Sequence, residues 1–218
     1  MMKIQLLKIT MIFFIGLAVV SCKNTKNETE AKAAEEVSQI KTEAVRYIAN
    51  ADSSTVAWKG SKPAKTHNGT IAISEGYLAF DKDKLSGGNF VIDMKTIKNL
   101  DIEDKEYNGK LVGHLSSADF FDVENHAFSV FAITGVENNG DKVMVKGNLT
   151  IKNIKKNIEF PATITMSDTT VTFKSEPFTI DRTEWDIKFH SGKFFEDLKD
   201  KLINDEIELA IEVIATKS

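Results

Sequence analysis

The chain has 218 residues and a formal net charge of −4, with 28 basic and 32 acidic residues. That length suits one large β domain or two small ones. A net acidic chain without a basic run argues against a nucleic-acid partner. The only cysteine is Cys22, so no disulfide can form within the chain.

The first 21 residues have the composition of a signal peptide. Lys3 and Lys8 are their only charges, and residues 9–20 form an apolar run. Such a run is too short to cross a bilayer as a helix and is typical of a signal-peptide core. Removal of this segment takes away two lysines and no acidic residue, which changes the net charge from −4 to −6.

Val19-Val-Ser-Cys22 follows the apolar run at once and resembles a bacterial lipobox, in which the cysteine is acylated. The alternative is ordinary secretory cleavage that leaves Cys22 as a stray thiol. We expect the lipobox, and hence a lipoprotein of the bacterial cell envelope that is anchored in a membrane through Cys22, on the periplasmic side. No polybasic patch is visible, so the lipid alone would supply the attachment.

Residues 22–44 are predicted to form a flexible, lipidated tether that carries a domain spanning residues 45–218. The tether is rich in Lys, Glu, Asn, Thr and Ala, and its only large aliphatic residues are Val37 and Ile40. Such a segment cannot bury enough apolar surface to order itself well.

Residues 45–218 alternate between apolar and polar side chains as β-strands do, most clearly over 142–151, 157–165 and 206–213. Segment 127–136 is apolar on both faces, so periodicity does not decide which face points inward. About eight or nine strands with little helix indicate an all-β fold, either a sandwich or a closed barrel. Loops or turns are predicted at residues 62–69, 75–76, 85–88, 138–141 and 155–156.

The stretch His114-Leu-Ser-Ser-Ala-Asp-Phe-Phe-Asp122 breaks this alternation. A strand would send Phe120 and Phe121 to opposite faces, whereas a short helical turn against a core can bury both rings. We therefore predict a short helical segment that plugs or turns a corner of the β core. The charged connection before it, residues 99–113, is long enough to carry function or to act as a lid.

The same stretch resembles the signature of the YceI-like proteins, a polyisoprenoid-binding, lipocalin-like family. The resemblance runs from about Thr55 to the C-terminus and implies an antiparallel eight-stranded lipocalin-like barrel that holds an isoprenoid or similar lipid. The chain departs from the family at Asp186, where Gly is usual, and near His190, where a small residue is usual. The other matching blocks, in the family's order, are Gly87-Gly-Asn-Phe-Val-Ile-Asp-Met94, Gly147-Asn-Leu-Thr-Ile-Lys152, Ile158-Glu-Phe-Pro161 and Ile180-Asp-Arg-Thr-Glu-Trp185.

The apolar residues of the inward strand faces are the first candidate ligand site. The alternative is that they fill a solid core, as alternating apolar residues usually do; the resemblance favours a hollow interior. A hollow lined by Phe and branched aliphatic residues suits a hydrocarbon, since each buried CH₂ contributes about 0.8 kcal/mol. The predicted lining residues are Phe90, Ile92, Phe128, Val130, Val145, Leu149, Phe160, Ile164, Val171, Phe173, Ile207, Leu209 and Ile211.

Arg182 and Trp185 are the second candidate. In one interpretation Arg182 binds an anionic lipid head group while Trp185 covers the mouth of the barrel. In the other, which we favour, Arg182 forms a structural ion pair with Asp181 at a strand corner.

No catalytic residue, metal site or cofactor is predicted. The chain lacks Gly-x-Ser-x-Gly, His-Glu-x-x-His and a phosphate-binding loop, and none of its four histidines lie at ligand spacings. We expect non-catalytic binding of an isoprenoid or quinone-like lipid, for storage or transfer. Two alternatives stay open: a structural or stress-related envelope protein with a filled barrel and a protein partner, and an enzyme in which His114 or His190 converges with Asp181 and Arg182. A homodimer is also left open.

Overall fold

The computed structural model describes residues 28–139 and 142–218, and these form one β-barrel domain. The elements in chain order are β1 (Lys32–Ala33), β2 (Val45–Ala49), β3 (Thr55–Lys62), β4 (Lys65–Asp81), β5 (Lys84–Asn99), α1 (Lys105–Ser116), β6 (Phe128–Asn139), β7 (Lys142–Ile151), β8 (Ile154–Met166), β9 (Thr170–Ser175), β10 (Phe178–Asp181), η1 (Arg182–Trp185), η2 (Lys199–Lys201) and β11 (Glu206–Lys217).

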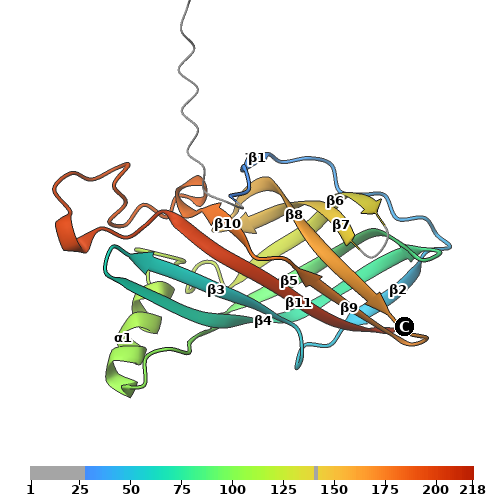
Figure 1. The fold of residues 1–218 in the computed structure, drawn as a ribbon, viewed down its shortest axis with the longest axis horizontal. Coiled ribbons are helices and arrows are strands. Elements are labelled where there is room, and N and C mark those ends of the chain that lie inside the picture. Colours follow the sequence, from blue (N-terminus) through green and yellow to red (C-terminus); the bar gives the residue numbers. More distant parts are fainter. Residues whose placement is uncertain (1–27, 140–141) are drawn as a thin grey trace, which may run out of the picture.

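Eight of these strands close into an antiparallel ring in the order β3, β4, β5, β6, β7, β8, β9 and β11, with β11 pairing back to β3 (Figure 1). Strand β2 pairs with β4 and β11 beyond the end of β3, and β10 pairs with β11 beyond β9. The expected all-β, eight-stranded barrel is confirmed. A sandwich is ruled out because the hydrogen-bonded path returns to its start instead of leaving two sheets with free edges.

One half of the barrel interior is packed solid. It lies toward the end that carries the C-terminus, and aromatic rings dominate it: Phe160 stacks on Phe178 with centroids 4.3 Å apart and contacts Phe131 at 5.3 Å. Among the described residues, every buried hydrophobic residue of the core lies between Tyr47 and Ala215. The described domain therefore has a self-contained core and is expected to fold on its own.

Two glycines that read as turn signals lie inside strand β4. The predicted loop at 62–69 and the predicted turn at 75–76 are wrong, since β4 runs unbroken from Lys65 to Asp81 and the turn from β3 is at residues 63–64. A Cβ on Gly69 would lie 2.7 Å from the Trp58 ring, and one on Gly76 would lie 2.5 Å from the Asn89 carbonyl oxygen. Both glycines thus permit close approach, a use that the sequence does not distinguish from a turn.

Three other predicted turns are displaced or untested. Strands β4 and β5 join at residues 82–83 instead of 85–88, and β7 and β8 join at Lys152 and Asn153 instead of 155–156. Lys152 and Asn153 adopt φ values of 49° and 62°, as a tight hairpin turn requires. Of the predicted turn at 138–141, the last two residues lie outside the described part, although β6 and β7 pair up to Asn139 and Lys142.

Most of helix α1 lies within residues 99–113, which were predicted to be a charged connection. Asp104 caps its start by accepting hydrogen bonds from the Glu106 and Tyr107 amides at 2.9 and 3.0 Å. Leu115 is its only buried residue, so no apolar stripe marked the helix in the sequence. The predicted helical turn is confirmed as its last turn, and Phe120 beyond it is buried against the core.

The segment before β2 lies along the outside of the barrel and is not the flexible tether that composition predicted. We call residues 28–44 the N-terminal strap. Asn148 of β7 donates to the Glu35 carbonyl at 2.7 Å and accepts from the Glu35 amide at 3.0 Å. The Ser38 amide donates to the Ile133 carbonyl at 3.0 Å, and β1 pairs with β8. The strap is thus held by backbone and amide hydrogen bonds, which an argument from apolar burial does not count.

Replacing Asn148 should release the strap. Asn148 is buried on the outer face of the barrel, and Asn148→Ala removes two hydrogen bonds to Glu35 and one from Asn157. We expect a loss of about 1–3 kcal/mol in the free energy of unfolding and faster cleavage after Glu35 by a glutamyl endopeptidase. Thr150→Ala, two residues along the same face, is the matched control. Equal cleavage rates in both variants would show that Asn148 does not hold the strap.

No helix within residues 28–139 and 142–218 is long and apolar enough to cross a membrane. The predicted signal peptide and Cys22 precede the described residues.

Candidate ligand cavity

The other half of the barrel interior holds a cavity of about 220 Å³. It lies at the end where α1 and the loop after η1 are found, opposite the C-terminus (Figure 1). Side chains from β3, β4, β5, β6, β7, β10 and β11 form its wall, and α1 with the following turn covers one side. The apolar lining residues are Val56, Trp58, Ile71, Ile92, Met94, Leu111, Leu115, Phe120, Phe121, Leu149, Ile151, Ile180, Ile187, Ile203, Ile207 and Leu209.

Polar side chains line the cavity in smaller number, and several already have protein partners. Asn204 donates to the Ser61 hydroxyl at 2.8 Å. The Nδ1 atom of His67 lies 2.8 Å from the Asp101 carboxylate, whose other oxygen accepts from the Asn68 amide. Desolvation alone would raise the pKa of Asp101, but these hydrogen bonds lower it, so the carboxylate stays ionised. The cavity is therefore an apolar space with a few paired polar groups.

The structure divides the predicted lining residues into three groups. Ile92, Leu149, Ile207 and Leu209 line the cavity. A second group packs in or against the filled core instead: Phe90, Val145, Phe160, Ile164, Val171, Phe173 and Ile211. Both expected arrangements, the hollow and the solid interior, are thus present, one in each half of the barrel.

Phe128 and Val130 form the third group, and placing them inside the barrel is wrong. Phe128 is 56% exposed, whereas its neighbours Ser129 and Phe131 are buried inside. Because both faces of this strand are apolar, the pattern allowed either register, and one step moves every side chain to the opposite face. The correct register brings Ser129 to the cavity wall.

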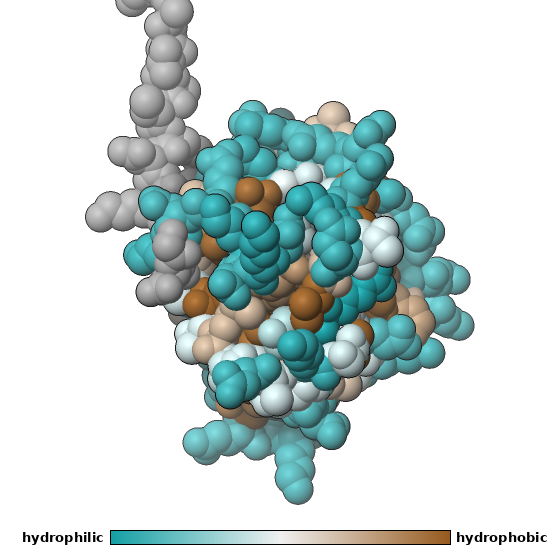
Figure 2. All heavy atoms as spheres, turned by 90° about the vertical axis from the view of Figure 1, so that its right-hand side faces the viewer, coloured by the Kyte–Doolittle hydropathy of each residue, from teal (hydrophilic) through white to brown (hydrophobic). Residues whose placement is uncertain are grey.

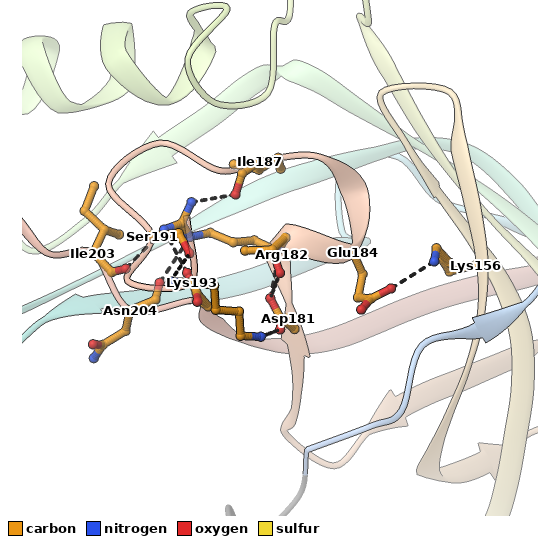
Figure 3. A network of polar contacts seen from close by, with 11 residues as sticks. Lys156, Asp181, Arg182, Glu184, Ile187, Ser191, Lys193, Ile203 and Asn204 are labelled. Carbon is orange, nitrogen blue, oxygen red and sulfur yellow. Dashed lines mark hydrogen bonds and ion pairs between the residues drawn. The ribbon is translucent and has the colours of Figure 1, made fainter. Parts of the chain in front are cut away.

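Arg182 lines the cavity, but its guanidinium is engaged by other protein groups. Its guanidinium donates to the carbonyls of Ile187 (2.6 Å), Ile203 (3.1 Å) and Asn204 (3.1 Å), and to the Asp205 carboxylate at 3.1 Å (Figure 3). Four of its five N–H groups are therefore used. Burial lowers the pKa of Arg182, while the nearby Asp205 carboxylate opposes that shift.

Through these hydrogen bonds Arg182 holds both ends of the loop at residues 186–205, which we call the mouth loop. The favoured interpretation, a structural ion pair, has the right role but the wrong partner, since Arg182 pairs with Asp205. Asp181 pairs with Lys193 and accepts from Thr183 (Figure 3). Desolvation would raise the pKa of Asp181, but its bonds with Lys193 and Thr183 lower it.

Trp185 does not cover the mouth. Its side chain is fully buried, and its ring N–H donates to the Leu149 carbonyl at 3.1 Å. It lies outside the cavity lining and belongs to the core beside it. The expected role of Trp185 as a cover is therefore wrong.

The two departures from the YceI-like pattern both occupy left-handed backbone positions. Asp186 has φ 58° and His190 has φ 50°. A glycine adopts this conformation without the steric cost that a side chain brings. The usual family glycine at the position of Asp186 thus has a backbone reason, and the chain keeps the turn with aspartate.

His114 stands at the mouth among aromatic rings. Its ring contacts Phe189 at 4.7 Å and Phe120 at 5.4 Å, and Phe189 stacks on His190. Asp181 and Arg182 are engaged elsewhere, so the polar constellation of the enzyme alternative does not assemble. Among the described residues, no group of three His, Cys, Asp or Glu side chains is placed to hold a metal ion.

Ligand affinity should fall in acid through His114. Desolvation lowers its pKa below the usual 6.5; Asp119 opposes this shift, and Lys62 and His190 add to it. A lowered folded pKa means that its contribution to stability is present above about 6.5 and is lost as the pH falls through the folded value. An apolar ligand would desolvate His114 further, so we expect binding to weaken as the pH falls through the folded pKa of His114, which lies below 6.5. Fluorescence titrations at several pH values test this. His114→Gln should flatten the profile, and an unchanged profile in that variant would contradict the assignment.

Several cavity residues escaped the sequence analysis. Four of them lie on segments that were predicted to be strands or that match the family pattern: Trp58, Met94, Ile151 and Ile180. Choosing the inward face of each strand would have identified them. His67 was placed in a polar loop, because the glycine two residues later read as a turn. Leu111 lies on the unpredicted part of α1.

Comparison with known proteins identifies the domain type. The model of the family described as "YceI-like domain" matches residues 47–215. A search of curated proteins gave no match.

Three solved structures share the fold. BcnA of Burkholderia cenocepacia is 22% identical with a TM-score of 0.60, over 77% of this chain and 99% of that one. A polyisoprenoid-binding domain from Saccharophagus degradans, implicated in plant cell wall breakdown, is 13% identical with a TM-score of 0.58, over 79% and 98%. The YceI protein of Campylobacter jejuni is 18% identical with a TM-score of 0.51, over 86% and 93%. At these identities the likeness concerns the fold.

Proposed function

The chain belongs to the YceI-like domain family, and from this membership we propose that it binds an apolar, isoprenoid or quinone-like lipid in the barrel cavity without catalysis, for storage or transfer in the bacterial envelope. The observation that carries the proposal is the cavity itself, enclosed by a closed barrel and lined by aliphatic and aromatic side chains. Such a space gains free energy from each CH₂ that enters it, about 0.8 kcal/mol. The Saccharophagus degradans domain, described as polyisoprenoid-binding, supports the choice of lipid class.

The cavity size limits how the lipid binds. About 220 Å³ is below the usual range of small-molecule pockets, and the Phe-rich half of the barrel blocks extension beyond it. We therefore propose that one end of the hydrocarbon enters the barrel while the rest stays at the mouth. Affinity for prenyl chains should rise by at least about tenfold with each added five-carbon unit, and then level off once the cavity is full.

The polar groups favour a neutral head group. Four of the five Arg182 N–H groups are held by protein acceptors, so this residue offers little to a pyrophosphate. Lys62, the other Lys or Arg side chain of the lining, is exposed to water. We therefore favour a quinone or prenol over a phosphorylated lipid, since desolvating a phosphate without a buried paired cation is costly.

The test uses residues 23–218, purified without detergent so that the strap and the core are both present. Organic extraction and mass spectrometry identify a co-purifying lipid, and native mass spectrometry gives its stoichiometry. A stoichiometric isoprenoid or quinone is the expected result. An empty protein that also takes up no added prenyl quinone would overturn the proposal and favour a structural role with a protein partner.

A further inference from the structure

The mouth end of the barrel exposes two neighbouring aromatic side chains. Phe194 and Phe195 of the mouth loop are each 49% exposed. Their amides donate to the Ser191 carbonyl, and the Lys188 ammonium lies 5.0 Å from the centre of the Phe194 ring. Neither ring lines the cavity. Exposed phenylalanine rings beside a lysine are suited to the boundary between lipid and water, because the rings can be buried while the ammonium group stays hydrated.

The mouth loop projects beyond the barrel at the end where the cavity lies (Figure 1). Arg182 fastens both ends of this loop through the carbonyls of Ile187 and Ile203. The loop is therefore a built projection with a fixed base. The opposite end carries mostly hydrophilic side chains around fewer hydrophobic ones (Figure 2). Ile48, which is 45% exposed, lies on β2 at that end.

The N-terminal strap determines where the chain leaves the described barrel. The Thr29 amide donates to the Thr179 carbonyl at 2.9 Å, and Glu28 pairs with Thr179 in a parallel bridge. Thr179 belongs to β10, which leads directly into η1 and the mouth loop. The strap thus carries the chain from β2, at the filled end, back to the strand that supports the mouth.

This path brings the predicted anchor close to the mouth. Cys22 precedes Glu28 by six residues, and six residues span at most about 20 Å. A free tether up to Ala44 would have allowed roughly 75 Å. An acyl chain on Cys22 would therefore hold the β10 side of the barrel next to the bilayer.

The net charge of the mouth loop indicates which force would hold it to a membrane. Residues 186–205 contain four lysines and five acidic residues, so the mouth loop carries no net positive charge. Attraction to anionic head groups is then weak, and burial of the two phenylalanines is the remaining driving force.

From these observations we propose that Phe194 and Phe195 dock the barrel mouth on a lipid bilayer, so that a lipid passes between membrane and cavity without crossing water. The proposal rests on the proposed lipid-binding function and adds the surface through which the lipid enters.

The test mimics the anchor. Residues 23–218 carry an N-terminal hexahistidine tag that binds phosphatidylcholine vesicles containing a nickel-chelating lipid. An environment-sensitive fluorophore is attached at Phe195→Cys or, as the matched control at the opposite end, at Ile48→Cys. We expect a blue-shifted emission and quenching by spin-labelled lipid at position 195 but not at position 48, with little dependence on salt. Equal responses at both positions, or none at 195, would overturn membrane docking and leave the phenylalanines to a protein partner.

A second readout measures transfer. The double variant Phe194→Ser/Phe195→Ser should slow uptake of a fluorescent prenyl quinone from vesicles about tenfold, because two half-exposed rings no longer bury in the bilayer. Its equilibrium affinity for the same quinone added from ethanol should be unchanged, as should its thermal unfolding. Ile48→Ser should keep the wild-type rate. An unchanged rate in the double variant contradicts the proposal. Absence of uptake in every variant would count against lipid binding itself, whereas the fluorophore at position 195 reports docking independently.

Discussion

Arg182→Met is expected to lower the free energy of unfolding by about 3–5 kcal/mol. The variant leaves the Asp205 carboxylate in a nearly buried position without its cation, and three carbonyls of the mouth loop lose their donor. Methionine replaces the apolar stem but supplies none of these hydrogen bonds. Chemical denaturation followed by circular dichroism gives the value.

Lys193→Met is the matched control for Arg182. Half of the Lys193 side chain is exposed, and its partner Asp181, which is 14% exposed, keeps two hydrogen bonds from Thr183 when the lysine is replaced. We therefore expect a smaller loss, of about 1 kcal/mol. A loss below about 1 kcal/mol in Arg182→Met would show that the guanidinium is not needed to hold the mouth loop. If the loss is large, a hydrogen-exchange map should show that residues 186–205 open before the barrel does.

Ser129→Phe is expected to reduce affinity for a prenyl quinone by at least about a hundredfold while the barrel stays folded. Ser129 is buried, faces inward and lines the cavity, so a ring at this position fills the space that the ligand needs. Excluding a few buried CH₂ groups removes about 3 kcal/mol or more of binding free energy. Calorimetric or fluorescence titration measures the affinity, and thermal unfolding checks the fold.

Val130→Phe provides the control for Ser129→Phe, since it adds a ring one residue along the same strand. Val130 faces outward and does not line the cavity, so its variant should bind as the wild type does. Equal binding by both variants would place the ligand elsewhere. Equal loss in both would indicate that the strand is disturbed, and the cavity assignment would then rest on the other wall residues.

The alternation of side chains was sufficient to predict the inward face of those strands whose two faces differ in polarity. The residues predicted to face inward on β7 and β11 do so, because apolar and charged side chains alternate along these strands with a period of two. In β6 the two faces look alike, and the prediction placed Phe128 and Val130 inside. The register of such a strand is decided by its neighbours, since Phe90 opposite Phe131 faces the same core.

The composition of the N-terminal strap did not predict that it is ordered, and the reason is related. The segment has little apolar surface, and its order comes from partners such as Asn148 and Thr179, which lie more than a hundred residues away in the sequence. In the sequence, Asn148 looks like an ordinary polar residue on the outer face of a strand. Contacts of this kind become visible only when the barrel has brought β7 and β10 to the strap.

The sequence by itself determined the all-β class, the resemblance to YceI-like proteins and the apolar character of the interior, because these depend on residue types and on short periods. Only the tertiary structure decided that the interior is filled in one half and hollow in the other, that Arg182 pairs with Asp205, and that the strap returns to the mouth. Cavity volume is the small difference between the space inside a ring and the side chains that fill it, and both depend on strands far apart in the chain.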